Sequence, residues 1–171
     1  YEILIGLVGP EMCIRDSVDI DNGPLMVIPK SHKGPVLSHF NNGVFCGAID
    51  PDDSDFDMSK AVTLTGKARS MTIHHARTLH GSSPNNSNRD RLVLFYECNS
   101  ADAWPLVGAG AYMKSTNPVQ LCNQLEKQMV CGKVSYQPRM DNVPVTIPLP
   151  PAPDYGSIFT SQKTGGAKSA F

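Results

Sequence analysis

The most informative stretch for the fold is SMTIHHARTLHGSSPNNSNRDRLVLFYEC, residues 70–98. Its two ends, residues 70–80 and 89–98, are rich in β-branched, aromatic and leucine side chains, which favour strands. Between them, residues 81–88 consist of Gly, Ser, Pro and Asn, the residues typical of turns. We therefore predict a strand that ends at His80, a polar turn, and a returning partner strand.

The flanking sequence adds more short strands and one helix. PLMVIP (24–29) and AVTLTG (61–66) have the composition of strands, and residues 117–132 repeat apolar side chains at helical spacing up to Gly132. VPVTIPLPPAP (143–153) contains too much proline for a helix or a central strand. These elements predict a mainly β fold, a sandwich or jelly-roll barrel, with one helix and an irregular Pro-rich C-terminal arm.

Composition narrows the class of protein. The chain has 171 residues, 40% of them hydrophobic and 18% charged, and its formal net charge is −1, which suits a globular domain. This balance gives no reason to expect a nucleic acid or an acidic membrane as a partner. The five cysteines form no CxxC pair, so we expect reduced thiols and a cytoplasmic protein. No apolar run reaches the roughly 20 residues of a membrane helix.

Two residues of the 70–98 stretch form a chemically coherent pair. An imidazole such as that of His80 can ligate a divalent metal, and the guanidinium of Arg91 can bind a carboxylate through two hydrogen bonds. A ligand that chelates a metal at one end and carries a carboxylate at the other would bridge them. Three alternatives stay open: a hydrogen-bonded His80 without metal, an Arg91 that is a surface charge paired with Asp90, and Arg89 as the carboxylate-binding residue in place of Arg91.

The order of several motifs resembles a known family. NGPLMVIPKSHKG (22–34), a histidine followed by GSSPNNS (81–87), and an arginine eleven residues after that histidine resemble the phytanoyl-CoA dioxygenase family of iron(II)- and 2-oxoglutarate-dependent oxygenases. ADAWPL (101–106) and the later VPVTIPLP and GSIF resemble bacterial members. The resemblance covers roughly residues 18–160.

The resemblance implies a double-stranded β-helix, a cupin-like jelly roll, that holds Fe(II) between two histidines and one carboxylate. It implies 2-oxoglutarate as cosubstrate, O2, a small-molecule substrate that is hydroxylated, and ascorbate as a supporting reductant. His80 would be the distal iron ligand, and Arg91 would pair with the distal carboxylate of 2-oxoglutarate. Ser82 would assist at that carboxylate, unless its hydroxyl serves the turn itself. We expect a monomer or a homodimer.

The first two iron ligands of such a site should be a His-x-Asp pair upstream of DNGPL (21–25), and the sequence contains none. Its histidines are residues 32, 39, 74, 75 and 80, and none of them is followed two positions later by Asp or Glu. We therefore expect an incomplete barrel and a chain that is inactive or nearly so. Two other hypotheses are a non-catalytic jelly-roll binding domain and a cupin-like metal protein that does not use 2-oxoglutarate.

The peptide EMCIRDS (11–17) stands where those ligands belong. A DNA that contains AGATGTGTATAAGAGACAG encodes it, and this DNA resembles the transposon mosaic end used to build sequencing libraries. We therefore divide the chain into a foreign segment (1–17), the C-terminal part of a dioxygenase jelly roll (18–160) and a flexible tail (161–171). The alternative is a genuine and unusual N-terminus.

The remaining polar residues are assigned structural roles. Neighbours on a strand point to opposite faces, so His74 and His75 cannot readily share one metal, and we expect both to be structural or pocket-lining. We expect His32 to make local hydrogen bonds and Trp104 to pack.

Two further features concern the surface. The acidic run at residues 50–57 has the composition of a solvated loop. Lys30 stands where the family often has Gly, and we expect this difference to affect only the local turn.

Overall fold

The computed structural model describes residues 8–14, 16–104, 117–140, 160, 162–163 and 165–168. The strands are β1 (Val8–Ile14), β2 (Leu25–Val27), β3 (Phe40–Asn41), β4 (Val44–Phe45), β5 (Val62–Leu64), β6 (Met71–His75), β7 (His80–Ser82) and β8 (Val93–Glu97). The described residues also hold the 3-10 helices η1 (Ser31–Lys33) and η2 (Met58–Lys60) and the α-helix α2 (Pro118–Gln128), and residues 160, 162 and 163 are helical as well. The predictions for residues 143–153 lie outside the described residues.

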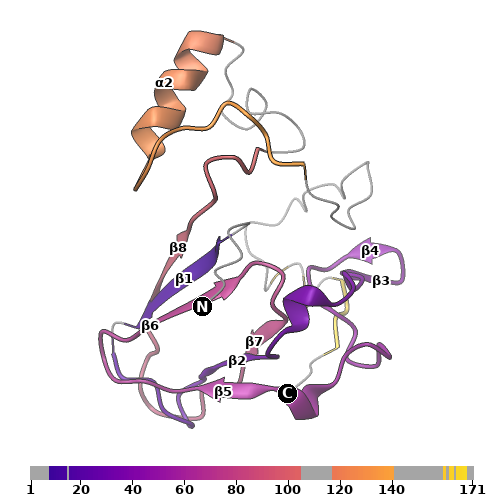
Figure 1. Cartoon of the computed structure of the whole chain (residues 1–171). Coiled ribbons are helices and arrows are strands. Elements are labelled where there is room, and N and C mark those ends of the chain that lie inside the picture. The colour runs from indigo at the N-terminus through magenta and orange to yellow at the C-terminus, as the bar shows by residue number, and fades with distance from the viewer. Residues whose placement is uncertain are drawn as a thin grey trace.

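Two antiparallel sheets form the body of the protein, in the orders β6-β1-β8 and β5-β2-β7 (Figure 1). A short hairpin, β3-β4, projects beside them. After the pair β2 and β5, the chain alternates between the sheets: β6 joins the first, β7 the second and β8 the first again. This alternation of strands between two antiparallel sheets is that of a jelly roll, so the predicted mainly β fold is confirmed.

The strand β1 is the centre of its sheet, although residues 11–14 belong to the segment that the sequence marks as foreign. Met12 lies opposite both Thr72 of β6 and Phe95 of β8, and the pairing continues along the strand on both sides. Ladder hydrogen bonds join backbone groups, so a β-forming segment of any origin can fill this position. The pairing therefore does not test the origin of residues 1–17, which stays a prediction.

The DNG sequence before β2 forms a buried turn that joins the start of the barrel segment to the loop after β7. Asn22 is 1% exposed, its side-chain oxygen accepts from the Asp19 N–H at 2.9 Å, and its amide donates to the Ser17 carbonyl at 3.0 Å. Gly23 has φ of +77°, and a Cβ there would lie 3.0 Å from the Ser83 carbonyl oxygen. Only glycine combines this backbone angle with so close an approach.

Four apolar side chains on one face of the strands β6 and β8 are exposed. Ile73 and Tyr96 share this face because both pair with Glu11, and Met71 and Leu94 share it because both pair with Cys13. Each of these four side chains is about half exposed, from 49% for Tyr96 to 59% for Ile73.

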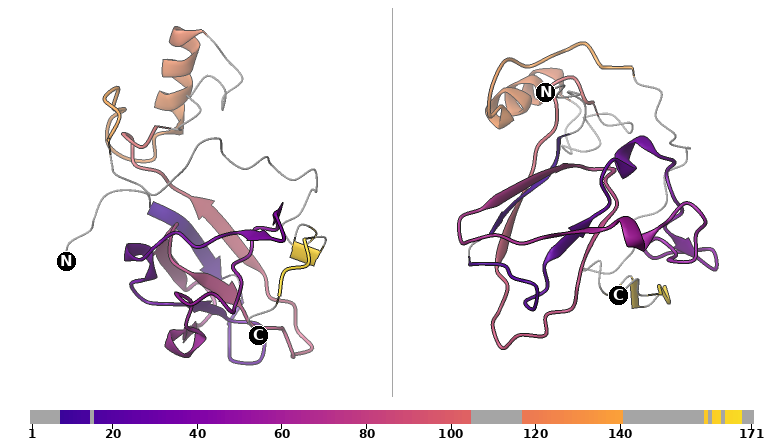
Figure 2. Two further views of the ribbon diagram at one scale, coloured as in Figure 1. Left: turned by 90° about the vertical axis from the view of Figure 1, so that its right-hand side faces the viewer. Right: turned by 60° about the horizontal axis from the view of Figure 1, so that its bottom comes forward.

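The predicted helix over 117–132 is present but shorter. Asn117 caps α2 by accepting hydrogen bonds from the N–H groups of Val119 and Gln120, and Pro118 occupies the first turn. The helix ends at Gln128, before Gly132, which has φ of +83°. In Figure 1 and in both views of Figure 2, α2 stands apart from the two sheets. No helix among the described residues is long and apolar enough to cross a membrane.

The described part of the predicted tail contacts the loops near β3. Asn41 donates from its side-chain amide to the carbonyls of Gly165 and Gly166, at 2.9 and 2.7 Å. Lys168 pairs with Asp50 at 3.4 Å and also with Asp52. Flexibility of residues 161–171 stays a prediction, but these contacts show where the described tail residues lie.

Candidate active site

His80 is the first residue of β7, not the last residue of a strand. The predicted strand over 70–80 is interrupted because β6 ends at His75 and the chain turns there. The Thr78 N–H donates to the His75 carbonyl at 2.8 Å, and the Arg77 N–H donates to His75 Nδ1 at 3.1 Å. This turn moves the chain from one sheet to the other, and the prediction that His80 closes a strand is therefore wrong.

The His80 ring is oriented by its own backbone. Its Nδ1 lies 2.7 Å from the Thr78 carbonyl oxygen, which can only accept, so Nδ1 carries the proton in this hydrogen bond. Nε2 is then the nitrogen with a free lone pair, the one that can ligate a metal. A backbone carbonyl that fixes the tautomer in this way is the usual outer partner of a metal-ligating histidine.

The segment PKSHKG holds the turn before His80 in place. Ser31 Oγ donates to the Ile28 carbonyl at 2.7 Å and accepts from the Leu79 N–H at 2.8 Å. The Arg77 guanidinium donates to the Gly34 carbonyl at 2.7 Å, and the Ile28 N–H donates to the Leu79 carbonyl at 2.9 Å. Ser31 is thus a positioning residue that the sequence analysis did not single out, although it lies within the motif that carries the family resemblance.

Arg91 and Ser82 lie together, as the family resemblance implies. The Arg91 guanidinium donates to Ser82 Oγ at 3.1 Å, and Ser82 lies two residues from His80 on the same face of β7. Arg91 precedes β8 and is half-buried, and this burial lowers the pKa of its guanidinium, which nevertheless stays charged. A half-buried cation beside a hydroxyl is suited to an anionic ligand.

Arg89, the alternative carboxylate-binding residue, is already occupied. Its guanidinium pairs with Asp19 at an exposed position. The hydrogen bond from Arg89 outweighs the raising effect of burial and holds the pKa of the Asp19 carboxyl below its ordinary value. Among the described residues Arg91 has no carboxylate within ion-pair distance, Asp90 included. The two arginines are therefore in different environments, and Arg91 is the one available to a ligand.

His74 and His75 point to opposite faces of β6, as predicted. The His75 ring lies 5.3 Å from that of His32, whereas the His74 ring lies 5.1 Å from that of His80. Burial, and then the neighbouring His80, lower the pKa of His74, so its ring is held neutral. For His32 the structure shows this ring contact, and the local hydrogen bonds expected of it stay a prediction.

The donor set fits one iron ligand of the expected type but not a complete iron site. His80 presents Nε2 with its tautomer fixed, as a ligand should. Over the described ranges, no three His, Cys, Asp or Glu side chains come together. His80 at Fe(II) therefore stays a prediction of the family resemblance, and the hydrogen bond at Nδ1 is compatible with it.

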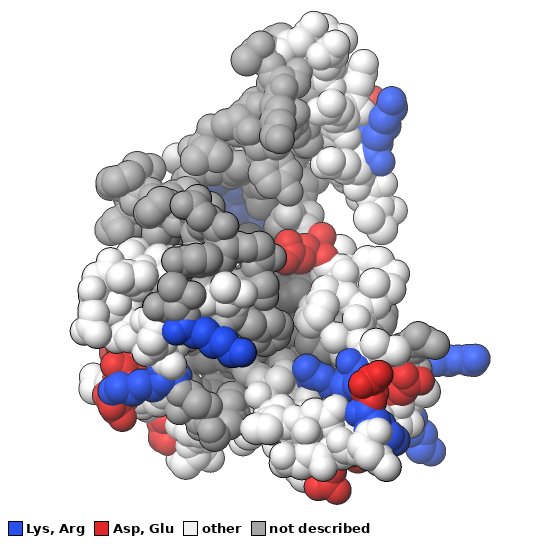
Figure 3. Space-filling model, turned by 180° about the vertical axis from the view of Figure 1, so that it is seen from behind, with Lys and Arg blue, Asp and Glu red and all other residues white. Residues whose placement is uncertain are grey.

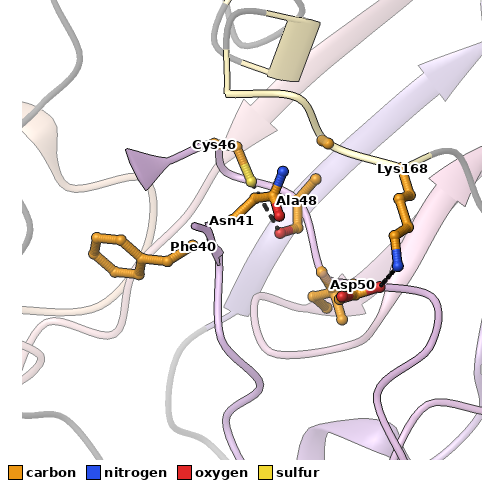
Figure 4. Close-up of a pocket in the computed structure, with 8 residues that line it drawn as sticks. Phe40, Asn41, Cys46, Ala48, Asp50 and Lys168 are labelled. Atoms are coloured by element: carbon orange, nitrogen blue, oxygen red, sulfur yellow. Dashed lines mark hydrogen bonds and ion pairs between the residues drawn. The ribbon is translucent and has the colours of Figure 1, made fainter. Parts of the chain in front are cut away.

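A small cavity lies elsewhere, between the β3-β4 region and the C-terminal residues (Figure 4). Cys46 and Asn41 line one side, and Lys168 reaches Asp50 on the other. Its volume of about 10 Å³ is enough for one water molecule at most. It is too small for 2-oxoglutarate, so the acidic loop at residues 50–57 stays a structural feature.

Lysine and arginine interleave with Asp and Glu on the face in Figure 3, without a large single-sign patch among the coloured residues.

Residues 12–93 match the family model described as Phytanoyl-CoA dioxygenase (PhyH). A curated protein of Stutzerimonas stutzeri, named "Probable alpha-ketoglutarate-dependent hypophosphite dioxygenase", is 39% identical over 152 residues, which are 86% of this chain and 50% of that protein. The chain thus spans about half the length of this relative.

Crystal structures of EvdO2 from Micromonospora carbonacea var. aurantiaca, one of them complexed with 2-oxoglutarate, are 28% identical to this chain. The alignment covers 58% of this chain and 43% of EvdO2, with a TM-score of 0.40. That score is too low to support an argument about the fold or the site.

Proposed function

We propose, from the match of residues 12–93 to the phytanoyl-CoA dioxygenase family, that the whole protein is an Fe(II)- and 2-oxoglutarate-dependent dioxygenase. The observation that carries the proposal is the grouping of His80, Ser82 and Arg91. The imidazole of His80, with its tautomer fixed, lies on β7. The half-buried guanidinium of Arg91, which precedes β8, reaches Ser82 on the same strand. These are the groups needed for a ligand that is a metal chelator at one end and a carboxylate at the other.

Each residue has a defined role in this proposal. His80 ligates the metal through Nε2, while the proton on Nδ1 stays with the Thr78 carbonyl. Arg91 binds the distal carboxylate of 2-oxoglutarate, and Ser82, which accepts a hydrogen bond from Arg91, holds the guanidinium in place and donates its own proton to the same carboxylate. Bound Fe(II) supplies the redox chemistry that couples O2 and 2-oxoglutarate to oxidation of the substrate.

The substrate belongs to the proposal only as a class. The relative from Stutzerimonas stutzeri is by its name a hypophosphite dioxygenase, so we propose hypophosphite as the first small molecule to assay with the whole protein.

The described cysteines, residues 46, 98, 122 and 131, are free thiols, which supports a reducing compartment such as the cytoplasm.

The test compares two arginines that lie two residues apart. We expect Arg91→Ala to weaken binding of 2-oxoglutarate by about 10- to 100-fold, because it removes a charge-assisted hydrogen bond. Arg89→Ala is the matched control, because Arg89 pairs with Asp19, and it should leave the affinity unchanged. Equilibrium dialysis of labelled 2-oxoglutarate against the chain, under anaerobic conditions with Fe(II), measures both. Equal affinities of the two variants would contradict the role of Arg91.

A second candidate function is a non-catalytic jelly-roll binding domain. It is favoured by one observation, the absence of a three-ligand metal cluster from the described residues. The gene sequence upstream of Val18 discriminates the two candidates. A His-x-Asp pair there supports the dioxygenase, whereas a continuous natural sequence without one supports the binding domain.

A further inference from the structure

The dipeptide Asn-Gly occurs twice in the sequence, at Asn22-Gly23 and at Asn42-Gly43. In this dipeptide the backbone nitrogen of the glycine can attack the side-chain amide carbon of the asparagine and close a succinimide ring. Glycine favours the attack because it has no Cβ to crowd its nitrogen and its backbone is freer than that of other residues. The same local chemistry is therefore available at two places, and the structure puts them in opposite environments.

The Asn42-Gly43 pair forms the exposed turn of the hairpin β3-β4, which projects beside the two sheets (Figure 1). Asn42 has φ of +48° and Gly43 has φ of +78°. Positive φ at both central residues is typical of a two-residue type I′ turn. No hydrogen bond to another described residue holds the Asn42 side chain. The amide carbon of Asn42 and the water needed for hydrolysis can therefore meet without unfolding of the sheets.

The Asn22-Gly23 pair is buried and held on every side. Asn22 is 1% exposed, its side-chain oxygen accepts from the Asp19 N–H at 2.9 Å, and its side-chain amide donates to the Ser17 carbonyl at 3.0 Å. The backbone of Gly23 lies against the Ser83 carbonyl, which would be 3.0 Å from a Cβ at this glycine. Rotation of the Asn22 side chain toward the glycine nitrogen would break both hydrogen bonds, so this site reacts only when the buried turn opens.

The hairpin that carries Asn42 can open at low cost. Each of its strands has two residues, and the pairing consists of Phe40 opposite Phe45 and Asn41 opposite Val44. A two-stranded hairpin is by itself marginally stable. The rings of Phe40 and Phe45 meet edge to face at 5.4 Å, and Phe40 remains 44% exposed. Asn42 can therefore leave the turn geometry by local opening, while the two sheets stay folded.

We propose that Asn42 is a site of spontaneous deamidation in the folded protein, and that the fold protects Asn22 from the same reaction. The bond that forms joins the Gly43 nitrogen to Asn42 Cγ, and the bond that breaks releases the side-chain nitrogen as ammonia. Water then opens the ring at either of its carbonyls and leaves aspartate or isoaspartate in place of Asn42. Water is the only co-reactant, and no oxidant or reductant takes part.

The modification changes the contact between the hairpin and the C-terminal residues. Isoaspartate lengthens the backbone inside a turn whose length sets the register of the hairpin. Asn41, the neighbour of the modified residue, donates from its side chain to the carbonyls of Gly165 and Gly166 at 2.9 and 2.7 Å. A shift of the hairpin register would displace this amide, so deamidation at Asn42 weakens the attachment of the described tail residues.

The test is incubation of the 171-residue chain in buffer made with water that carries heavy oxygen, followed by peptide mass spectrometry. The label enters only at asparagines that are hydrolysed during the incubation. We expect the label at Asn42 to accumulate more than about tenfold faster than at Asn22, because an exposed hairpin opens far more often than a buried turn. The same chain in urea is the matched control: with the structure removed, both Asn-Gly pairs should react at similar rates.

These two measurements separate protection by the fold from an effect of local sequence. Equal rates at the two sites in buffer, or a faster reaction at Asn22, overturn the inference. A rate difference that is as large in urea as in buffer also overturns it, because the difference would then come from the neighbouring residues and not from the structure.

Phe40→Ala tests the opening step. This variant removes the ring contact with Phe45 and should raise the rate at Asn42 about two- to tenfold, which corresponds to the contribution of one aromatic pair. Asn22 in the same chain serves as the internal control and should keep its rate. An unchanged rate at Asn42 in this variant would overturn the local opening of the hairpin on which the inference depends.

Discussion

Lys30 holds a backbone conformation that costs a lysine free energy. Its φ is +68°, in the left-handed region, at the start of η1. For residues with a Cβ this region is unfavourable by about 1–2 kcal/mol, whereas glycine adopts it freely. Lys30, where the family often has Gly, is therefore locally strained, and the Lys30 side chain is exposed.

We predict that Lys30→Gly stabilises the protein. Relief of the backbone strain is partly offset by the greater freedom of glycine in the unfolded chain, which leaves a net gain of about 0.5–1 kcal/mol in the free energy of unfolding. Thermal unfolding followed by circular dichroism measures this gain. Lys33→Gly is the control, because Lys33 lies in the same 3-10 helix without a positive φ, and it should lower stability. A loss of stability in both variants would contradict the strain at Lys30.

At the scale of elements, the site depends on the link between η1 and the turn that joins β6 to β7. Ser31 Oγ bridges the Ile28 carbonyl and the Leu79 N–H, directly before His80. The strands next to the site, β7 and β8, are the last strands in the order of their sheets, so each is held by one neighbouring strand in that order. An edge strand has ladder hydrogen bonds on one side only, so side-chain contacts such as that of Ser31 contribute more to its position.

We predict that Ser31→Ala destabilises the turn before His80. The Leu79 N–H would lose its acceptor, at a cost of about 1–3 kcal/mol for an unsatisfied buried donor. Hydrogen exchange of the Leu79 amide should become faster, together with a lower free energy of unfolding in urea. Ser38→Ala serves for comparison, because Ser38 accepts only an exposed hydrogen bond, from the Phe40 N–H, and it should have little effect. Unchanged exchange at Leu79 would exclude the bridge in solution.

At the scale of the whole molecule, a half-buried ion pair joins the segment after β8 to the segment after α2. Arg139 binds Asp102 through Nε at 2.9 Å and through a second nitrogen at 2.8 Å, and Ser100 donates to the same carboxylate. Trp104 Nε1 also donates to the Ser135 carbonyl at 3.0 Å, and packing of its ring stays a prediction. These contacts connect the barrel segment to the helix-bearing segment.

The ion pair between Arg139 and Asp102 makes the free energy of unfolding depend on pH. The hydrogen bond from Ser100, and then that from Arg139, lower the pKa of the Asp102 carboxyl below its ordinary value. A carboxyl whose pKa is lower in the folded than in the unfolded state contributes stability at neutral pH, and the contribution is lost as the pH falls below about 4. We predict that Asp102→Asn is less stable than the unaltered chain at pH 7 and that the difference shrinks in acid.

Urea unfolding at a series of pH values measures this difference. Asp90→Asn replaces an exposed carboxylate that has no ion pair among the described residues, and its stability should follow that of the unaltered chain. A constant gap between Asp102→Asn and the unaltered chain from pH 7 to low pH would show that the ion pair does not titrate as described.

The sequence by itself determined the β character of residues 70–98, the start of α2 at Asn117-Pro118, and the chemical types present at His80, Ser82 and Arg91. Propensity, capping and turn chemistry act between residues close in the chain, so they can be predicted from it. Even so, the strand break at His75 was missed, because β-branched composition does not reveal where a chain leaves one sheet for another.

Only the tertiary structure decided which residues of those types lie together. It paired Arg89 with Asp19 and left Arg91 beside Ser82, and it placed His74 against His80. It also placed β1, part of the segment predicted to be foreign, at the centre of a sheet. Each of these contacts joins different elements, and their positions are set by strand register and packing, which local sequence does not encode.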